Sequence, residues 1–317
     1  MPKGHQPRSG SLQYWPRKRA QKLLPSVNWD NLQKRNPDKK GLLGFICYKA
    51  GMARLYVKDN TPNSLTKGKK IILPISVVEC PPMKILSVRL YKRTLDGKKV
   101  VKDILGENLD KELKKRIKLP KEKRKFELKE EPEELTILVY PIVKKTGKKK
   151  KPEILEIGIG GTIQEKVEFV KKNIDKELNF KDYFEPAHSL DIKGVTKGHG
   201  FTGPVKRFGI SLKSHKSEKG VRRPGSLGPW KPHRVTFRTP LAGQFGFFTR
   251  IGYNKKLLGV GENLELIFKN YGKVKTSYAM IKGSVHGPAK RALVLTIPAR
   301  ETRRIQKRTY EIIKVLK

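Results

Sequence analysis

The chain of 317 residues is predicted to be mainly β with an α+β insertion, and two observations lead to this prediction. Short runs of β-branched and aromatic residues, separated by turn residues, occur both early and late in the chain. Between them lies a block in which apolar residues recur at helical spacing. We therefore expect the early and late runs to close one β-barrel that carries long basic extensions.

Residues 1–40 form a basic N-terminal extension with ten Lys or Arg against Asp30 and Asp38. Its prolines interrupt any helix longer than a few turns. Residues 14–19 (YWPRKR) mix aromatic rings with cations. Disordered segments are poor in aromatic residues, so this composition favours a tail that becomes ordered on a partner over a permanently disordered tail.

Residues 41–95 are expected to form the first part of the barrel. Their β-like runs are 44–48, 55–57, 71–75 and 85–88, and residues 59–63 (DNTPN) are a turn signal.

Residues 96–188 are expected to form the α+β insertion lobe. Leu109, Leu113 and Ile117 recur at helical spacing, and residues 135–143 and 153–159 are strand-like. Thr162 and Glu165 have the spacing of a capping box. The helix that they open would place five apolar residues on one face, namely Ile163, Val167, Val170, Ile174 and Leu178.

Residues 189–300 are expected to complete the barrel, with β-like runs at 264–268, 278–281 and 292–297. They contain a long arm, residues 193–256, and residues 301–317 form a basic C-terminal tail.

The net charge of +43 requires a polyanionic partner, because a free compact chain with this charge would repel itself. Residues 103–188 hold 18 acidic and 21 basic residues, so almost all of the excess lies elsewhere. Nucleic acid fits best, since each neutralised phosphate releases counterions. No apolar stretch approaches the ~18 residues of a membrane-spanning helix, and the N-terminus has no apolar core of a secretory signal.

The arm has the composition of an RNA-binding element. It holds 15 Lys or Arg, 11 Gly and eight aromatic residues, with Glu218 as its only acid. Arginine and aromatic rings stack on unpaired bases, and glycine lets the backbone approach phosphates closely. We expect RNA to order this arm.

Two other classes of function are disfavoured. Residues 198–203 match GxGxxG, but Pro204 and Gly209 are expected to prevent the helix that a dinucleotide fold needs. A nucleic-acid-acting enzyme, such as a methyltransferase or nuclease, would need a carboxylate or metal cluster, which the basic segments lack. Cys47 and Cys80 suggest no disulfide framework and are expected to be buried thiols in a reducing compartment. A free chromatin- or tRNA-binding protein would need an arm that folds by itself.

Several motifs together resemble the ribosomal protein L-three family of the large subunit, in order from about residue 5 to 300. They are 195–201 (VTKGHGF) with Gly203, 16–20 (PRKRA), 44–52 (GFICYKAGM), 160–161 (GG), 228–235 (GPWKPHRV), 242–244 (AGQ) and 281–283 (IKG) with Gly287, Lys290 and Arg291. The length and the insertion are more similar to the archaeal form. Lys206 stands where many eukaryotic members have a methylated histidine, so the resemblance does not extend to that modification.

This resemblance implies a structural part of the ribosome rather than an enzyme. It implies a translation-protein-type β-barrel with RNA-penetrating extensions, which binds rRNA near its 3′ end and acts early in subunit assembly. The arm would reach toward the peptidyl transferase centre with Trp230 at its tip. The expected neighbours are ribosomal proteins L-fourteen and L-twenty-four-e, in a cytoplasmic ribosome, with no membrane, small-molecule substrate, metal or other cofactor.

The residues expected to bind RNA are cations, histidines and one tryptophan of the basic segments. They are Arg17, Lys18, Arg19, Lys49, Lys197, His199, Lys206, Arg207, Lys213, Lys216, Arg222, Arg223, Trp230, His233, Arg234, Arg238, Arg250, Lys290 and Arg291.

Overall fold

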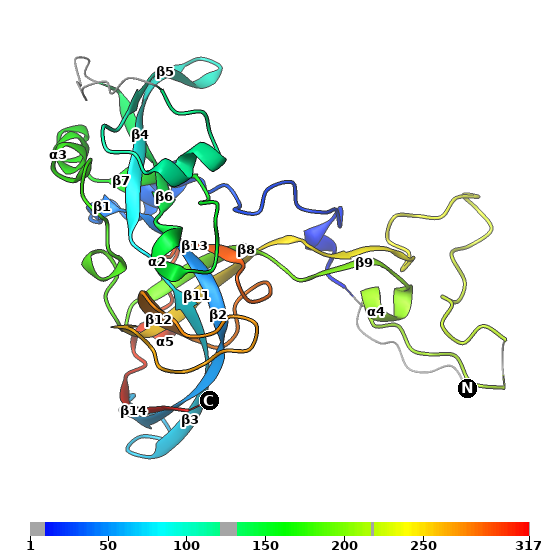
Figure 1. Cartoon of the computed structure of the whole chain (residues 1–317). Coiled ribbons are helices and arrows are strands. Elements are labelled where there is room, and N and C mark those ends of the chain that lie inside the picture. Colours follow the sequence, from blue (N-terminus) through cyan, green and yellow to red (C-terminus); the bar gives the residue numbers. More distant parts are fainter. Residues whose placement is uncertain (1–9, 121–131, 217–218, 317) are drawn as a thin grey trace. The chain divides into compact units, whose positions relative to one another are not determined.

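The structure is a computed structural model that describes residues 10–120, 132–216 and 219–316, and its chain divides into two compact units (Figure 1). We call Leu23–Gly194 with Arg250–Lys317 the core unit, and Met1–Lys22 with Val195–Thr249 the arm unit. The ends of the predicted arm, residues 193–194 and 250–256, therefore lie in the core unit, where they belong to barrel strands.

The core unit is built around a closed sheet. Its strands are β2 (Gly44–Asp59), β3 (Lys70–Glu79), β8 (Ser189–Val195), β11 (Thr249–Glu262), β12 (Ser277–Lys282), β13 (Ala292–Thr296) and β14 (Tyr310–Leu316). They follow the order β13-β8-β11-β12-β3-β2-β14, and β13 also pairs with the first half of β2. This second pairing closes six strands into a barrel, and the mainly β prediction is confirmed.

Strand β2 shows why these residues form a barrel. In its second half Ala53, Leu55 and Val57 are buried while Met52 and Arg54 are exposed, which is the period-two pattern of a sheet with one solvated face. In its first half both faces are buried. Phe45 there packs edge-on against Phe180, with ring centres 5.2 Å apart.

A second sheet of five strands forms the lobe. The strands are β1 (Gly41–Leu42), β4 (Met83–Thr94), β5 (Gly97–Leu105), β6 (Glu134–Pro141) and β7 (Leu155–Gly160), in the order β1-β7-β6-β4-β5. The strand pairing thus changes sheet at residues 80–82, whereas the sequence expectation put the change at 96. A strand pattern shows that residues are extended, but it does not show which strand they pair with.

The helices of the core unit are short. They are α1 (Trp29–Arg35), α2 (Val143–Thr146), α3 (Ile163–Asn173) and α5 (Arg303–Gln306), with 3-10 turns at Lys111–Lys115 and Phe180–Asp182. The predicted capping box is confirmed, since the Thr162 amide donates to Glu165 Oε2 at 2.9 Å and the Glu165 amide donates to Thr162 Oγ1 at 3.4 Å. Helix α3 ends at Asn173, so Leu178 is buried in the core but is not on the helix. Leu113 is buried in its 3-10 turn, where Leu109 and Ile117 pack against it.

The expected strand at 264–268 is wrong. Only Phe268 makes a β-bridge there, with Gly272. The segment 263–276 is held instead by a side chain, because the amides of Lys275 and Thr276 donate to the buried carboxylate of Glu79 at 2.9 and 3.0 Å. A carboxylate that accepts backbone N–H groups replaces the ladder hydrogen bonds of a strand.

The arm unit contains few regular elements. They are a 3-10 turn at Leu12–Tyr14, β9 (Gly198–Thr202), α4 (Pro204–Phe208) and β10 (Gly243–Gly246), and β9 pairs with β10. The expectation that Pro204 prevents a helix is wrong, because Pro204 occupies the first turn, where its missing N–H is not needed. Gly209, with φ of +68°, ends the helix after five residues, which is too short for a dinucleotide fold.

Candidate nucleic-acid interface

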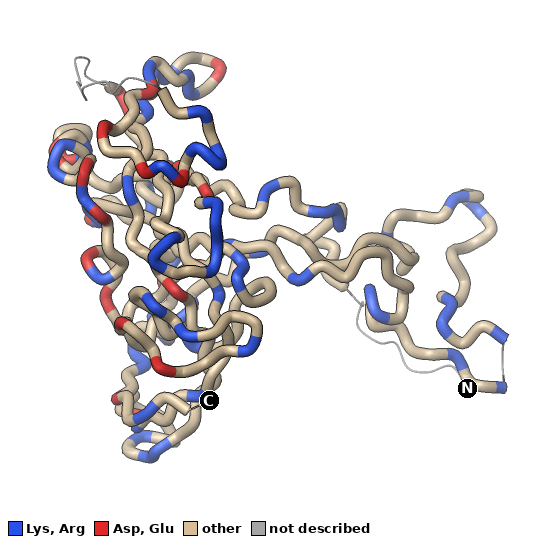
Figure 2. The backbone as a smooth tube through the Cα atoms, viewed as in Figure 1, with Lys and Arg blue, Asp and Glu red and all other residues tan. Residues whose placement is uncertain are grey.

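The arm unit is almost purely cationic. It holds four Lys or Arg in residues 10–22 and eleven in residues 195–249. Its described residues include no acid, and Glu218 lies outside the described residues (Figure 2). The described part of this unit therefore carries positive charge without any carboxylate of its own, which is the composition of a surface that binds a polyanion.

The N-terminal segment and the arm pack together around aromatic rings. Trp15 stacks on Phe208 with ring centres 6.0 Å apart and meets Phe237 edge-on at 5.6 Å. Arg17 lies over the Phe208 ring at 4.3 Å, and its guanidinium donates to the Arg207 carbonyl at 3.0 Å. The tail that the sequence predicts to order on a partner thus already has a partner within the chain, the first part of the arm.

Arg207 is a structural cation of the arm. Its guanidinium donates to the carbonyl of Gln244 at 3.1 Å and to that of Leu241 at 2.8 Å, which joins α4 to β10. Burial lowers the pKa of Arg207, and the side chain is half-buried. Arg17 and Arg207 therefore hold backbone carbonyls and rings inside the arm unit as well as carrying charge.

The base of the arm is a second aromatic layer. His199 stacks on Phe245 with ring centres 5.1 Å apart, and Phe245 meets Phe248 edge-on at 6.4 Å. The N-terminal segment contributes here too, since the Ala20 amide donates to the Phe247 carbonyl at 2.8 Å and Arg19 lies over the Phe247 ring at 5.1 Å.

Trp230 lies on a turn, and its ring is exposed to solvent. The His233 amide donates to the Trp230 carbonyl at 3.0 Å, and the two rings meet edge-on at 4.9 Å. The side chain of Trp230 is 82% exposed. Trp15 and Trp29, in contrast, are half-buried. An exposed tryptophan among cations has the geometry of a platform for an unpaired base.

Most of the predicted RNA-binding residues in the arm unit are exposed, while Arg17, Arg207 and Lys213 are half-buried. The exposed ones are Lys18, Arg19, Lys197, His199, Lys206, Lys216, Arg222, Arg223, Trp230, His233, Arg234 and Arg238.

The remaining four predicted residues lie in the core unit. Lys290 is exposed, and Arg250 and Arg291 are half-buried. Lys49 is buried, and its amine donates to the carbonyls of Val285 at 2.7 Å and Gly287 at 3.0 Å. In this fold the Lys49 amine fastens a loop to β2, so it is turned away from any external phosphate, a role that its charge in the sequence did not reveal.

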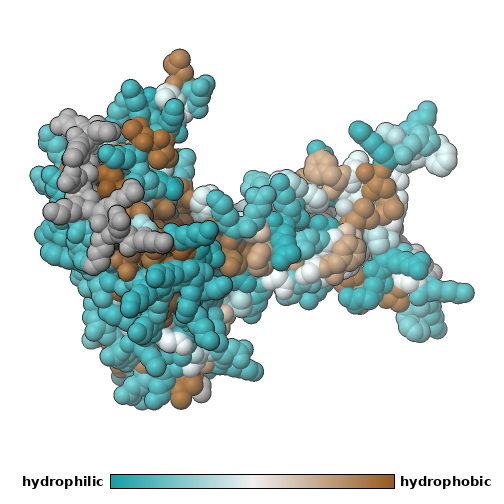
Figure 3. Space-filling model, turned by 45° about the horizontal axis from the view of Figure 1, so that its top comes forward, coloured by the Kyte–Doolittle hydropathy of each residue, from teal (hydrophilic) through white to brown (hydrophobic). Residues whose placement is uncertain are grey.

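Three exposed aromatic residues of the arm were not among the predicted site residues. Phe201 is 80% exposed, Phe237 is 65% exposed and Tyr253 is 59% exposed. Figure 3 shows apolar patches beside hydrophilic side chains on the arm unit. The signal was present in the aromatic content of the arm, but composition alone does not separate rings that pack, such as Phe208, from rings that stay open.

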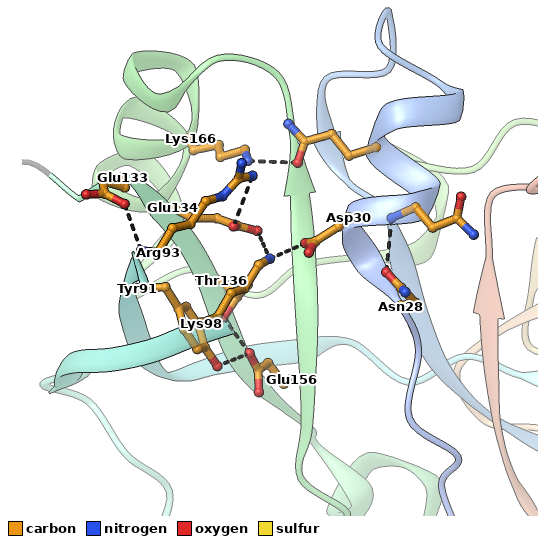
Figure 4. Close-up of polar contacts among 12 residues, drawn as sticks. Asn28, Asp30, Tyr91, Arg93, Lys98, Glu133, Glu134, Thr136, Glu156 and Lys166 are labelled. Carbon is orange, nitrogen blue, oxygen red and sulfur yellow. Dashed lines mark hydrogen bonds and ion pairs between the residues drawn. The ribbon is translucent and has the colours of Figure 1, made fainter. Parts of the chain in front are cut away.

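A charged cavity of the core unit bears on the enzyme alternative. Its volume is about 670 Å³, and α1, α3 and the ends of β4 and β6 line it (Figure 4). Lys98 pairs there with both Asp30 and Glu134, the latter at 2.5 Å. Burial raises the pKa of Asp30, but hydrogen bonds and the charge of Lys98 outweigh it and leave the pKa below its ordinary value. Through these ion pairs Lys98 joins Asp30 of α1 to Glu134 of β6, so the cluster links α1 to the lobe.

Among residues 10–120, 132–216 and 219–316, no cluster of His, Cys, Asp or Glu has the arrangement of a metal site. Within the same residues, no helix is long and apolar enough to cross a membrane.

Comparisons with known proteins agree on one family. The family model described as Ribosomal protein L3 matches residues 1–314. The chain is similar to proteins named large ribosomal subunit protein uL3. That of Archaeoglobus fulgidus is 39% identical over 92% of this chain and 91% of its own length. Those of Methanocaldococcus jannaschii and Methanococcus vannielii are each 41% identical over 92% of this chain, and over 90% and 91% of their own lengths.

Proposed function

The chain belongs to the ribosomal protein L3 family, and on that premise we propose that it is a structural constituent of the large ribosomal subunit. It binds the large-subunit rRNA near the 3′ end, nucleates subunit assembly, and extends its arm toward the peptidyl transferase centre. The observation that carries this proposal is the arm unit, whose described residues include fifteen Lys or Arg and no Asp or Glu.

The geometry supports different roles for the exposed cations, the exposed rings and the half-buried arginines of the arm unit. Exposed side chains such as Arg222 and Arg223 neutralise phosphates, which supplies salt-dependent affinity. Exposed rings such as Trp230 and Phe201 stack on unpaired bases. Arg17 and Arg207 shape the surface that presents them, because they cross-link the arm from inside.

We extend the proposal to the surroundings of the protein. In it the chain works in the cytoplasmic ribosome beside ribosomal proteins L14 and L24e, with no catalytic role of its own and no cofactor. Its similar proteins carry names of ribosomal components and not of enzymes. This also disfavours a free chromatin- or tRNA-binding protein, whose arm would have to act without the ribosome.

Binding to rRNA fragments tests the proposal. The purified chain is expected to bind a transcript of the 3′ domain of large-subunit rRNA roughly 10³-fold more tightly than a 5′-domain transcript of equal length, because specific sites exceed non-specific ones by at least this factor. Filter binding at several salt concentrations, with heparin as competitor, measures the ratio. Equal affinity for both transcripts would contradict the 3′ site and leave only non-specific charge attraction.

Trp230→Ala tests the position of the arm. The substitution is expected to leave the melting temperature of the free protein nearly unchanged, since surface changes away from packing contacts usually stay within about 0.5 kcal/mol. In mutant ribosomes it should alter peptidyl-transfer rates and sensitivity to antibiotics of the catalytic centre, because a lost base stack is worth about 1–3 kcal/mol. Trp230→Phe keeps an aromatic ring, so ribosomes with this variant should show much smaller changes in peptidyl-transfer rate and antibiotic sensitivity than Trp230→Ala ribosomes. Unchanged rates and sensitivities in Trp230→Ala ribosomes would count against an arm near the catalytic centre.

A further inference from the structure

The two cysteines of the chain meet inside the core unit, although 33 residues separate them. Cys47 lies in β2, and Cys80 directly follows β3. Both side chains are 0% exposed, and their sulfur atoms lie 2.9 Å apart. Their spacing in the sequence gave no sign of this pairing, because the pairing depends on the register of two strands.

The register places the two residues directly opposite each other. Tyr48 pairs with Glu79 in the antiparallel ladder of β2 and β3, so one further step brings Cys47 opposite Cys80. The Cys80 amide donates to the Ser277 carbonyl at 2.7 Å, and the Ser277 hydroxyl donates to the Cys80 carbonyl at 2.6 Å. Both backbone groups of Cys80 thus face β12 and not β2.

This orientation identifies a non-hydrogen-bonded pair of the β2–β3 ladder. In such pairs the two Cα atoms lie about 4.5 Å apart, with the side chains close together. Disulfides span Cα separations of about 4.4–6.8 Å, so the backbone already has a spacing that accepts the bond. We propose that Cys47 and Cys80 form an intrachain disulfide that staples β3 to β2 where the chain leaves the barrel for the lobe.

The bond forms by exchange with an external disulfide, such as a low-molecular-weight disulfide or a protein disulfide oxidant. The thiolate of one cysteine attacks it and releases one reduced thiol, and the second cysteine then displaces the other thiol from the mixed disulfide. The chain loses two protons and two electrons in total, and the external disulfide becomes two thiols. A metal site does not explain the pair, since a structural zinc site needs four ligands and no metal cluster occurs among the described residues.

The burial of the two thiols determines at which stage of folding the thiol–disulfide exchange occurs. It raises the pKa of Cys47 far above its ordinary value, so in the closed barrel the thiol stays protonated and unreactive. Exchange therefore takes place while the barrel is still open, during folding. Once the barrel has closed, the same burial keeps reductants away from the bond.

The test begins with native large subunits. Purified large subunits are denatured at neutral pH in the presence of a maleimide, which alkylates free thiols as they become exposed, and the intact mass of the chain is measured. We expect a mass two hydrogens below that of the reduced chain, with no adduct, and two adducts when a reductant precedes the maleimide. Two adducts without reductant would overturn the proposal.

A second measurement uses the recombinant full chain refolded in oxidised or in reduced glutathione. The oxidised form should melt about 5–10 °C above the reduced form, as expected for one bridge in a domain of this size. A Cys47→Ala, Cys80→Ala double variant should melt at one temperature under both conditions. Wild-type chain that keeps both thiols after oxidative refolding would also overturn the proposal.

Discussion

Replacing Lys206, Arg222, Arg223 and Arg234 together with glutamine is expected to weaken binding to 3′-domain rRNA about 10³-fold at ~0.1 M salt. All four side chains are exposed in the arm unit. Each phosphate contact contributes roughly 0.7–0.9 to the slope of log K against log salt, so losing four contacts lowers the slope by about 3. Glutamine is shorter than lysine or arginine but remains polar, so at these exposed positions the loss of charge is the main change.

The matched control removes the same charge from the charge-balanced lobe. Lys114, Lys115, Lys171 and Lys172 are also exposed, and they lie in the block that holds 18 of the 29 acidic residues. Their replacement by glutamine should change the slope far less. Filter binding from about 0.05 to 0.3 M salt measures both variants. If the two variants lose affinity equally, net charge alone governs binding, and the arm has no special role.

Glu79→Ala is expected to destabilise the core unit by about 3–5 kcal/mol, because the buried Tyr271 hydroxyl and the part-buried donors of Lys275 and Thr276 lose their acceptor. Glu79 is fully buried, and it accepts hydrogen bonds from the amides of Lys275 and Thr276 and from the hydroxyls of Thr276 and Tyr271. Burial and the Glu79 carboxylate raise the pKa of Tyr271 well above its ordinary value, so this hydroxyl remains a donor. Alanine leaves these donors without an acceptor, at about 1–3 kcal/mol each.

The loss of stability in Glu79→Ala should appear first in segment 263–276. Segment 263–276 places Phe268, Tyr271 and Val274 against the core and has almost no ladder hydrogen bonds of its own. Hydrogen exchange in this segment should therefore rise before the barrel melts. Glu79→Gln, which retains one acceptor oxygen, should lose less stability, and Glu265→Ala at an exposed position of the same segment should stay within about 0.5 kcal/mol. A Glu79→Ala protein that melts like Glu265→Ala would show that the segment is held by packing alone.

Local signals in the sequence predicted local structure well. The capping box at Thr162 and Glu165 is present as expected, and the period of Leu109, Leu113 and Ile117 marks a buried turn. These features depend on residues three or four positions apart, which interact through the backbone of a single turn. The β-like runs predicted at 44–48, 55–57 and 71–75 likewise lie within β2 and β3.

Features that depend on the pairing of strands far apart in the chain could not be predicted from the sequence. The strand β4 pairs with β5 and β6 in the lobe, and Cys47 meets Cys80, only because of strand order. The sequence likewise identifies a cationic side chain, but it does not show where in the fold that side chain points. Lys49 and Arg207 carry the same kind of charge as Arg222, yet their donors point to carbonyls within their own units. An isolated apolar run such as 264–268 predicts a strand, but it cannot reveal that no partner strand of the described residues lies beside it, nor that Glu79 binds the amides of Lys275 and Thr276 further along the chain.

The packing of Trp15 and Arg17 on Phe208 also sets an order of events during synthesis. A ribosome that adds roughly 5–20 residues per second makes the tail about 10–40 s before it makes Phe208. Throughout that interval the Trp15 ring and the Arg17 guanidinium of the nascent chain lack the Phe208 ring against which they pack in the folded arm unit. A nascent chain that ends before Phe208 cannot make this contact at all, so the tail acquires its packing only after the first part of the arm has been synthesised.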